Sequence, residues 1–207
     1  MCSSDLPRLC PKARGVETVR DIVRAAGDLG LEVLSLYAFS SENWKRPEDE
    51  INDLMGLLRA FIKSDIDEFA ANDVRLKIIG NYQALAPDVV ALIDDAIART
   101  AGNTRTTLVV ALNYGSQDEL VRAASKAALH GAITAGTIEA HLDTADLPPL
   151  DLLIRTSGEQ RLSNFMLWQA AYAELWFTDT LWPDFNKADL AQALSDFEGR
   201  ERRYGGR

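Results

Sequence analysis

The sequence predicts an α/β fold, with a central, mostly parallel sheet flanked by helices. Short apolar runs alternate along the chain with longer amphipathic stretches, which is the order expected when helices connect parallel strands. The 207 residues are enough for one domain with a sizeable core. A composition of 47% hydrophobic and 26% charged residues is typical of a globular protein.

Five nearly continuous apolar runs are predicted as strands. The first, LEVLSLYAF, ends at a polar segment, as a buried parallel strand does at its carboxyl end. The five predicted strands cover residues 31–39, 74–80, 107–113, 150–155 and 175–178.

Amphipathic stretches between these runs are predicted as helices, over residues 16–29, 47–71, 87–101, 117–129 and 187–202. A further helix is expected over 164–175. In the stretch 48–71, apolar residues recur at three- and four-residue steps: Ile51, Leu54, Met55, Leu58, Phe61, Ile62, Ile66 and Phe69. Such a face either packs on the core or lines an apolar channel for a long hydrocarbon, and the periodicity does not separate the two.

The charge balance argues against some classes of partner. With 22 basic and 31 acidic residues the net charge is −9, which disfavours non-specific binding to nucleic acid. No apolar run approaches the about 20 residues that span a bilayer, and no secretory signal is visible. Cys2 and Cys10 have no metal-ligand spacing, so a reducing cytoplasm is expected.

The polar segment 40–47, SSENWKRP, follows the first predicted strand. Ligands of parallel α/β sheets bind beyond the carboxyl ends of strands, and this segment offers hydroxyls, a carboxylate, an amide and cations there. A purely structural role at the start of the next helix accounts for Pro47 and the acidic residues after it. It does not account for Asn43, Trp44 and Arg46 together, which favours a binding role.

A second polar cluster follows the predicted strand 150–155. Arg155 ends the strand, a Thr-Ser-Gly turn follows, and Arg161 and Ser163 lead into the expected helix. Guanidinium groups and free N–H groups at a helix start both bind phosphate. Pairing of Arg155 with Glu159 is the structural alternative, but the combination favours a phosphate site.

Glu174 stands in the apolar context YAELW. A buried carboxylate requires a cation or hydrogen-bond donors. Its partner is therefore expected to be either an arginine or a bound Mg²⁺, and the sequence rates the two equally.

Together these stretches resemble the undecaprenyl diphosphate synthase family, the cis-prenyltransferases. The most specific matches are LYAFSSENWKRP (36–47), TAGNTRTTLVVALNYG (100–115), DLLIRTSGEQRLSNFMLWQAAYAELWFTDTLWPDF (151–185) and ERRYGG (201–206). The resemblance covers nearly the whole chain from Gly15 onwards. It implies a soluble homodimer with a hydrophobic tunnel beside the sheet, and it makes the stretch 48–71 a wall of that tunnel.

The resemblance also implies an activity: Mg²⁺-dependent condensation of isopentenyl diphosphate onto an allylic diphosphate such as farnesyl diphosphate, with cis double bonds. The product would be a polyprenyl diphosphate that serves as a lipid-carrier precursor, with peripheral membrane contact for its release. Asn43 would assist proton removal, and Glu174 would bind Mg²⁺. The substrate-binding positions would be Ser40, Ser41, Glu42, Trp44, Arg46, Arg155, Arg161, Leu162 and Ser163. The motif at 203–205 would reach toward the partner's active site.

One family motif has no counterpart in this sequence. The family begins with a strand carrying Asp-Gly-Asn-Gly-Arg-Trp, whereas residues 1–14 read MCSSDLPRLCPKAR. CSSDL is what the DNA string TGCTCTTCCGATCT, part of a common sequencing adapter, encodes, so residues 1–14 are expected to be non-native or disordered. The domain over 15–207 is then expected to lack its first strand. An inactive fragment and a non-catalytic partner subunit are the alternatives to an active enzyme.

Overall fold

The computed structural model describes residues 9–200, with side chains from Arg14 onwards. The chain divides into two compact units. Unit 1 consists of Met1–Leu31, Leu150–Leu162 and Gln169–Arg207, and unit 2 of Glu32–Pro149 and Ser163–Trp168. The expected terminal motif at 203–205 lies outside the described residues, as do residues 1–8.

Unit 2 contains a three-stranded parallel sheet in the order β1-β3-β2. Its strands are β1 (Val33–Ser40), β2 (Val74–Ile79) and β3 (Thr106–Tyr114). Leu36 and Ile78 both pair with Val110 of the central strand, so the three carboxyl ends lie at one edge of the sheet. Most of β3 is buried, which explains why its sequence is a continuous apolar run.

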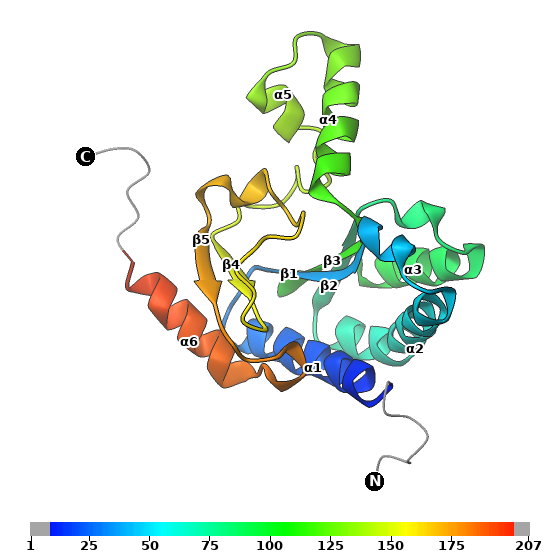
Figure 1. The fold of residues 1–207 in the computed structure, drawn as a ribbon, viewed down its shortest axis with the longest axis vertical. Helices are drawn as coiled ribbons and strands as arrows, with labels where there is room; N and C mark the ends of the chain where they lie inside the picture. Colours follow the sequence, from blue (N-terminus) through cyan, green and yellow to red (C-terminus); the bar gives the residue numbers. More distant parts are fainter. Residues whose placement is uncertain (1–8, 201–207) are drawn as a thin grey trace. The chain divides into compact units, whose positions relative to one another are not determined.

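Two helices, α2 (Glu48–Ala71) and α3 (Pro87–Thr100), lie together beside β2 (Figure 1). Met55, Ile62, Ile66 and Phe69 of α2 are buried, as the three- and four-residue spacing predicts. Arg59 of α2 forms a bidentate ion pair with Asp88 of α3: its Nε donates to Oδ2 at 2.6 Å, and its Nη2 donates to Oδ1 at 3.1 Å.

The carboxyl end of β3 leads into α4 (Ser116–His130), and the short α5 (Ala135–Glu139) packs against α4 (Figure 1). Thr134 begins α5 with a capping box: its side chain accepts the Thr137 N–H. This short helix was not predicted from the sequence.

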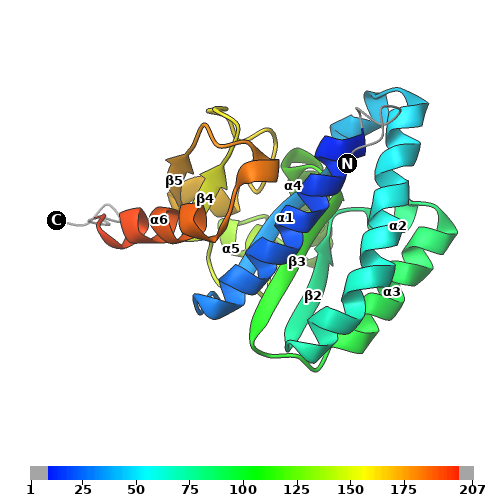
Figure 2. The same cartoon turned by 90° about the horizontal axis from the view of Figure 1, so that it is seen from below.

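Unit 1 combines a two-stranded parallel sheet, β4 (Leu152–Arg155) and β5 (Glu174–Phe177), with α1 (Leu9–Asp28) and α6 (Lys187–Glu198), as Figure 2 shows. The Trp182 indole N–H donates to Gly15 O at 3.0 Å, and the Thr18 hydroxyl donates to Pro183 O at 3.1 Å. These bonds hold the 182–184 turn against α1.

The structure confirms the predicted α/β class with a parallel sheet flanked by helices, and the predicted strands agree with β1 to β5 within two residues at either end. One helix prediction was wrong. Residues 164–175 form no continuous helix, because Ser163, Asn164 and Met166 have φ values of 49°, 61° and 47°. These left-handed conformations are incompatible with a right-handed helix. None of the described helices is both long and apolar enough to cross a membrane.

Candidate active site

The polar segment after β1 forms the short helix η1 (Ser41–Lys45). Ser40 caps it: the Ser40 hydroxyl accepts the Glu42 N–H at 3.1 Å, and Asn43 Oδ1 accepts the Ser40 N–H at 2.9 Å. The sequence therefore folds this segment into a hydrogen-bonded turn at the carboxyl edge of the sheet, with the amide of Asn43 oriented by the Ser40 backbone.

Glu42 is the centre of the η1 network. Its carboxylate accepts hydrogen bonds from the hydroxyls of Ser40 and Ser41 and, at 2.8 Å, from Asn164 Nδ2. The hydrogen bonds from Ser40, and then from Asn164, hold the pKa of the Glu42 carboxyl below its usual value. The carboxylate therefore stays ionised and fixes both hydroxyls that were predicted to contact substrate.

The segment Ser163–Trp168 packs on the start of α4. Asn164 O accepts the Ser116 N–H at 2.8 Å, and Asn164 Oδ1 accepts the Gln117 N–H at 2.9 Å. A side chain at Gly115 would meet Ser41 Oγ at 2.6 Å and Asn164 Nδ2 at 2.8 Å, so only glycine lets the three segments meet. Asn164 thus occupies N–H groups of α4, while no helix begins at Ser163 to offer the anion site expected there.

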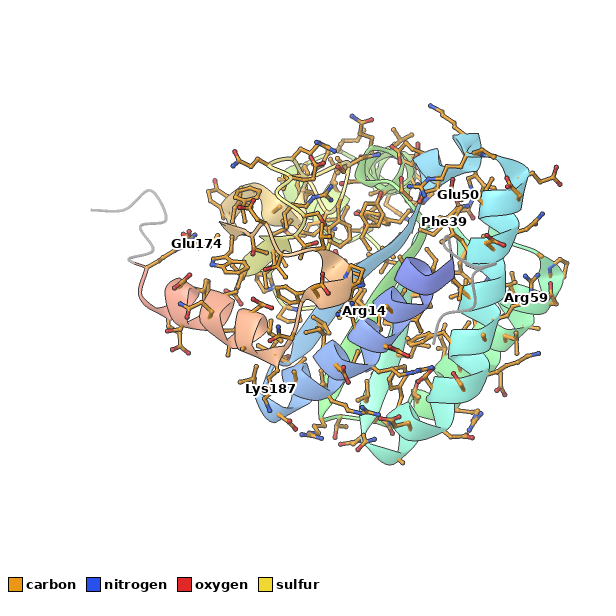
Figure 3. The ribbon with its side chains drawn as sticks, turned by 60° about the horizontal axis from the view of Figure 1, so that its bottom comes forward. Arg14, Phe39, Glu50, Arg59, Glu174 and Lys187 are labelled. Atoms are coloured by element: carbon orange, nitrogen blue, oxygen red, sulfur yellow. The ribbon has the colours of Figure 1, made fainter. Side chains whose placement is uncertain are left out.

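Trp44 lies partly exposed, with 44% of its surface accessible. Its ring packs edge-on against Phe39 at a centroid distance of 5.1 Å, and its indole N–H donates to Asn113 Oδ1 at 2.7 Å. Arg46 pairs with Glu50 in the first turn of α2 at 2.7 Å; Figure 3 labels Phe39 and Glu50 in this region. Both predicted substrate contacts are thus held by neighbouring strands and helices.

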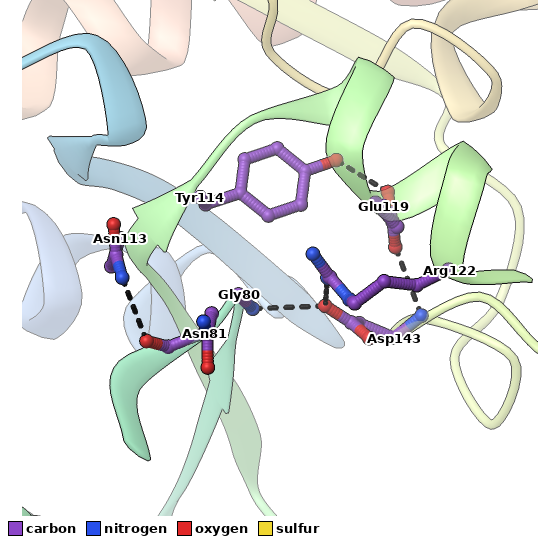
Figure 4. Close-up of polar contacts among 7 residues, drawn as sticks. All are labelled: Gly80, Asn81, Asn113, Tyr114, Glu119, Arg122 and Asp143. Atoms are coloured by element: carbon purple, nitrogen blue, oxygen red, sulfur yellow. Dashed lines mark hydrogen bonds and ion pairs between the residues drawn. The ribbon is translucent and has the colours of Figure 1, made fainter. Parts of the chain in front are cut away.

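A buried polar network connects the carboxyl ends of β2 and β3 to α4 (Figure 4). The carboxylate of Glu119, which is 1% exposed, accepts the Tyr114 hydroxyl at 2.5 Å and the Asp143 N–H at 2.9 Å. Asp143 in turn accepts the Gly80 N–H and a guanidinium hydrogen of Arg122, each at 2.9 Å. This network ties the ends of β2 and β3 to α4 and the segment after α5.

In unit 1, Arg155 is the last residue of β4. Its Nε is buried and has no hydrogen-bond partner among the described residues. The turn after it is fixed because the Ser157 and Gly158 N–H groups donate to Thr180 O and Thr178 O, both at 2.9 Å. A buried, unsatisfied cationic donor fits an anionic ligand. Arg161, rather than Arg155, pairs with Glu159.

Glu174 lies at the start of β5 rather than in a helix, beside the carboxyl end of α6 (Figure 3). Its carboxylate pairs with Arg200 at 2.7 Å, and Arg200 also donates to Leu175 O at 3.0 Å. An arginine therefore does partner this carboxylate. Within residues 14–200, whose side chains the structure describes, no group of three or more metal-ligating side chains comes together. One carboxylate suits Mg²⁺ only when diphosphate oxygens and water complete the coordination, which is the usual arrangement for this ion.

The predicted site residues thus fall into two groups. Residues Ser40 to Arg46 and Ser163 belong to unit 2, whereas Arg155, Arg161, Leu162 and Glu174 belong to unit 1. The sequence prediction gave no role to Asn113, Asn164 or Arg200. Asn113 carried a usable signal, because it is polar and directly ends a predicted strand, whereas Arg200 carried none.

Comparison with known proteins agrees with this picture. The family described as "Putative undecaprenyl diphosphate synthase" matches residues 3–205. An isoprenyl transferase of Zymomonas mobilis is 54% identical over 209 residues, which is 97% of this chain and 84% of that protein. The chain therefore belongs to the undecaprenyl diphosphate synthase family, and its similarity to isoprenyl transferases supports a prenyltransferase.

Two solved structures are similar to the whole fold. A probable undecaprenyl diphosphate synthase of Campylobacter jejuni matches with a TM-score of 0.85 and 34% identity, covering 93% of this chain and 92% of that one. The lavandulyl diphosphate synthase of Lavandula x intermedia, solved with dimethylallyl diphosphate, matches with a TM-score of 0.88 and 35% identity over 93% and 86% of the two chains.

Proposed function

We propose that this protein condenses isopentenyl diphosphate with an allylic diphosphate, farnesyl diphosphate, and forms a polyprenyl diphosphate with cis double bonds. Membership of the family supports the reaction class. The observation that carries the proposal in this chain is the buried Arg155 Nε, a cationic donor that lacks a partner among the described residues and suits a diphosphate. An allylic diphosphate is also the ligand with which the Lavandula relative was solved.

In this proposal the η1 segment supplies oriented polar groups at the carboxyl edge of the sheet. Asn43 Oδ1 is occupied by the Ser40 N–H, so its amide presents the donor end, Nδ2, to a ligand. A donor suits a diphosphate oxygen, and an amide is a weak base. Asn43 therefore assists by holding the diphosphate in place while the released diphosphate takes the proton.

The remaining assignments follow the chemistry of the side chains. Arg155, Arg161, Leu162 and Ser163 would bind isopentenyl diphosphate, and Ser40, Ser41, Glu42, Trp44 and Arg46 the allylic substrate. The apolar face of α2 would line the hydrocarbon tunnel. Glu174 would hold Mg²⁺, which supplies charge stabilisation for the diphosphate leaving group. Because Arg200 pairs with Glu174, this guanidinium would have to turn toward another anion, and a diphosphate offers one.

The test uses purified protein with labelled isopentenyl diphosphate, farnesyl diphosphate and Mg²⁺, read out by label incorporation and, separately, by calorimetric binding of each diphosphate. Arg155→Gln should reduce incorporation about 30-fold or more, since losing one partner of a desolvated ion pair costs about 2–5 kcal/mol. Arg99→Gln, which removes a surface ion pair between Arg99 of α3 and Asp67 of α2, is the control and should leave incorporation unchanged.

The two measurements separate the possible outcomes. Incorporation that is lost in Arg155→Gln supports the proposal. Binding without incorporation supports the alternative of a non-catalytic chain. If the protein shows neither binding of the diphosphates nor incorporation of label, the proposal is refuted.

Homodimer formation, the cytoplasmic location and membrane contact for product release stay predictions. Sedimentation tests the first, and cell fractionation tests the other two.

A further inference from the structure

The side chain of Asn113 connects the three segments that leave the unit 2 sheet. Its Oδ1 accepts the indole N–H of Trp44 at 2.7 Å, and its Nδ2 donates to Asn81 O at 2.8 Å. Trp44 follows β1, Asn81 follows β2, and Asn113 itself lies at the end of β3 (Figure 4 shows the Asn81–Asn113 pair). A single amide therefore joins all three carboxyl ends of this sheet.

The chemistry of the two partners allows only one orientation of this amide. An indole N–H is a donor only, and a backbone carbonyl is an acceptor only. Reversing the amide would place the NH₂ group against the indole hydrogen and the oxygen against the Asn81 carbonyl, so both bonds would be lost. A carboxylate at position 113 would keep the first bond and lose the second.

The backbone around Asn113 is built to hold this orientation. Asn113 has a φ of 49°, a left-handed conformation that asparagine tolerates better than most residues, and its carbonyl accepts the Asn81 N–H at 3.1 Å. Gly80, with a φ of 97°, lets β2 pass close to β3, where a side chain would meet Leu112 O at 2.4 Å. The backbone of Asn113 is thus held by the Asn81 N–H and by the close approach of β2, and this places its side-chain amide beside Trp44.

We propose that Asn113 is a positioning residue that holds Trp44, and with it the η1 segment that carries Asn43, in the conformation that binds the allylic diphosphate. The substrate part of this inference rests on the proposed function. The segment is partly exposed, and the bond from Asn164 to Glu42 also joins it to a distant part of the chain. Loss of the Asn113 tie removes the second such attachment, at Trp44, and lets η1 open more often. A ligand that binds only the closed form then binds more weakly, in proportion to the loss of the closed population.

The variant chosen for the test is Asn113→Gly. Glycine adopts a φ of 49° without strain, so it removes the amide and leaves the backbone conformation accessible. Trp44→Phe removes the indole N–H and keeps an aromatic ring against Phe39. Asn113→Asp keeps the acceptor for the indole. Asn72→Ala, which removes a hydrogen bond from the Asn72 side-chain amide to Glu68 O at the end of α2, is the matched control.

The readout is amide hydrogen exchange of the Arg46 N–H, which donates to Asn43 O at 3.0 Å and reports opening of η1. Asn113→Gly should speed this exchange about 2- to 10-fold, the range that one partly exposed hydrogen bond provides. In the Trp44→Phe background the same change should have no effect. In Asn113→Asp and in Asn72→Ala, the Arg46 N–H should exchange at a rate close to that in the unmodified protein.

Calorimetric binding of farnesyl diphosphate provides the second arm, and its dissociation constant should rise in Asn113→Gly by the ratio of the closed fractions that exchange gives for the two proteins. Equal acceleration in both Trp44 backgrounds, or none in either, would overturn the inference. So would a farnesyl diphosphate dissociation constant that does not rise in Asn113→Gly when exchange shows a measurable loss of the closed fraction. If the unmodified protein binds no prenyl diphosphate, the proposed function fails, while the exchange comparison still decides whether Asn113 holds η1.

Discussion

Replacing Tyr114 with phenylalanine should destabilise unit 2 far more than the loss of one oxygen atom suggests. Tyr114 is fully buried, and its hydroxyl donates to the carboxylate of Glu119, which is itself 1% exposed. The change keeps the ring and its contacts with Tyr37 and Phe165. It leaves a buried carboxylate with one donor fewer, and hydrogen bonds to charged groups contribute about 1.5–3 kcal/mol.

This free energy predicts a measurable shift. A chain of this size loses about 2–4 °C of midpoint temperature per kcal/mol, so Tyr114→Phe should melt roughly 3–12 °C lower. Urea unfolding followed by tryptophan fluorescence gives the free energy directly. Tyr82→Phe is the matched control, because its hydroxyl bonds the exposed Asp94 at 3.0 Å and should contribute well under about 1 kcal/mol.

The comparison between the two variants decides the reasoning. If Tyr114→Phe and Tyr82→Phe have equal free energies of unfolding, the Tyr114–Glu119 bond is not a significant support of the sheet edge. A double-mutant cycle with Glu119→Gln isolates the pairwise contribution from changes in packing. A coupling near zero would also contradict the assignment.

Three further predictions concern the same unit. Burial, and then the bond to Glu119, raise the pKa of the Tyr114 hydroxyl above its ordinary value of about 10. The contribution of this hydroxyl to the free energy of unfolding is therefore intact below that pH and is lost as the pH rises. Tyr114→Phe should accordingly flatten the fall in the free energy of unfolding at alkaline pH. Gly80→Ala should lower that free energy by more than about 2 kcal/mol in urea, because a left-handed φ and the nearby Leu112 carbonyl both oppose a side chain; a neutral result would contradict the described end of β2. Ile93→Ala, at a fully buried position of α3, should lower it by about 2–5 kcal/mol, and a loss below 1 kcal/mol would refute the packing.

The sequence predicted the regular elements well because their signals are local. Continuous apolar runs and three- and four-residue periodicity depend only on neighbouring residues, and they located β1 to β5 and most helix starts. The expected helix over 164–175 failed because a distant partner competes for its backbone. The N–H groups at the start of α4 bond Asn164, and this outweighs the helical pattern of the residues that follow.

The candidate site shows the same division. The cluster from Ser40 to Trp44 was predictable, since a polar turn after an apolar strand is visible in the sequence. The pairing of Glu174 with Arg200 was not, because it depends on how α6 packs beside β5. Asn113 became interpretable only once the register placed it beside the ends of two other strands.

The composition of unit 1 from three separate stretches of chain has a consequence for synthesis on the ribosome. The face of α1 that carries Gly15 and Thr18 leaves the ribosome before its partners Trp182 and Pro183, which are made about 165 residues later. At about 5–20 residues per second this face waits on the order of 10–30 seconds. Unit 2, nearly all of it contiguous, can fold in that interval. The nascent α1 therefore stays without these two contacts until residues 182 and 183 have been made.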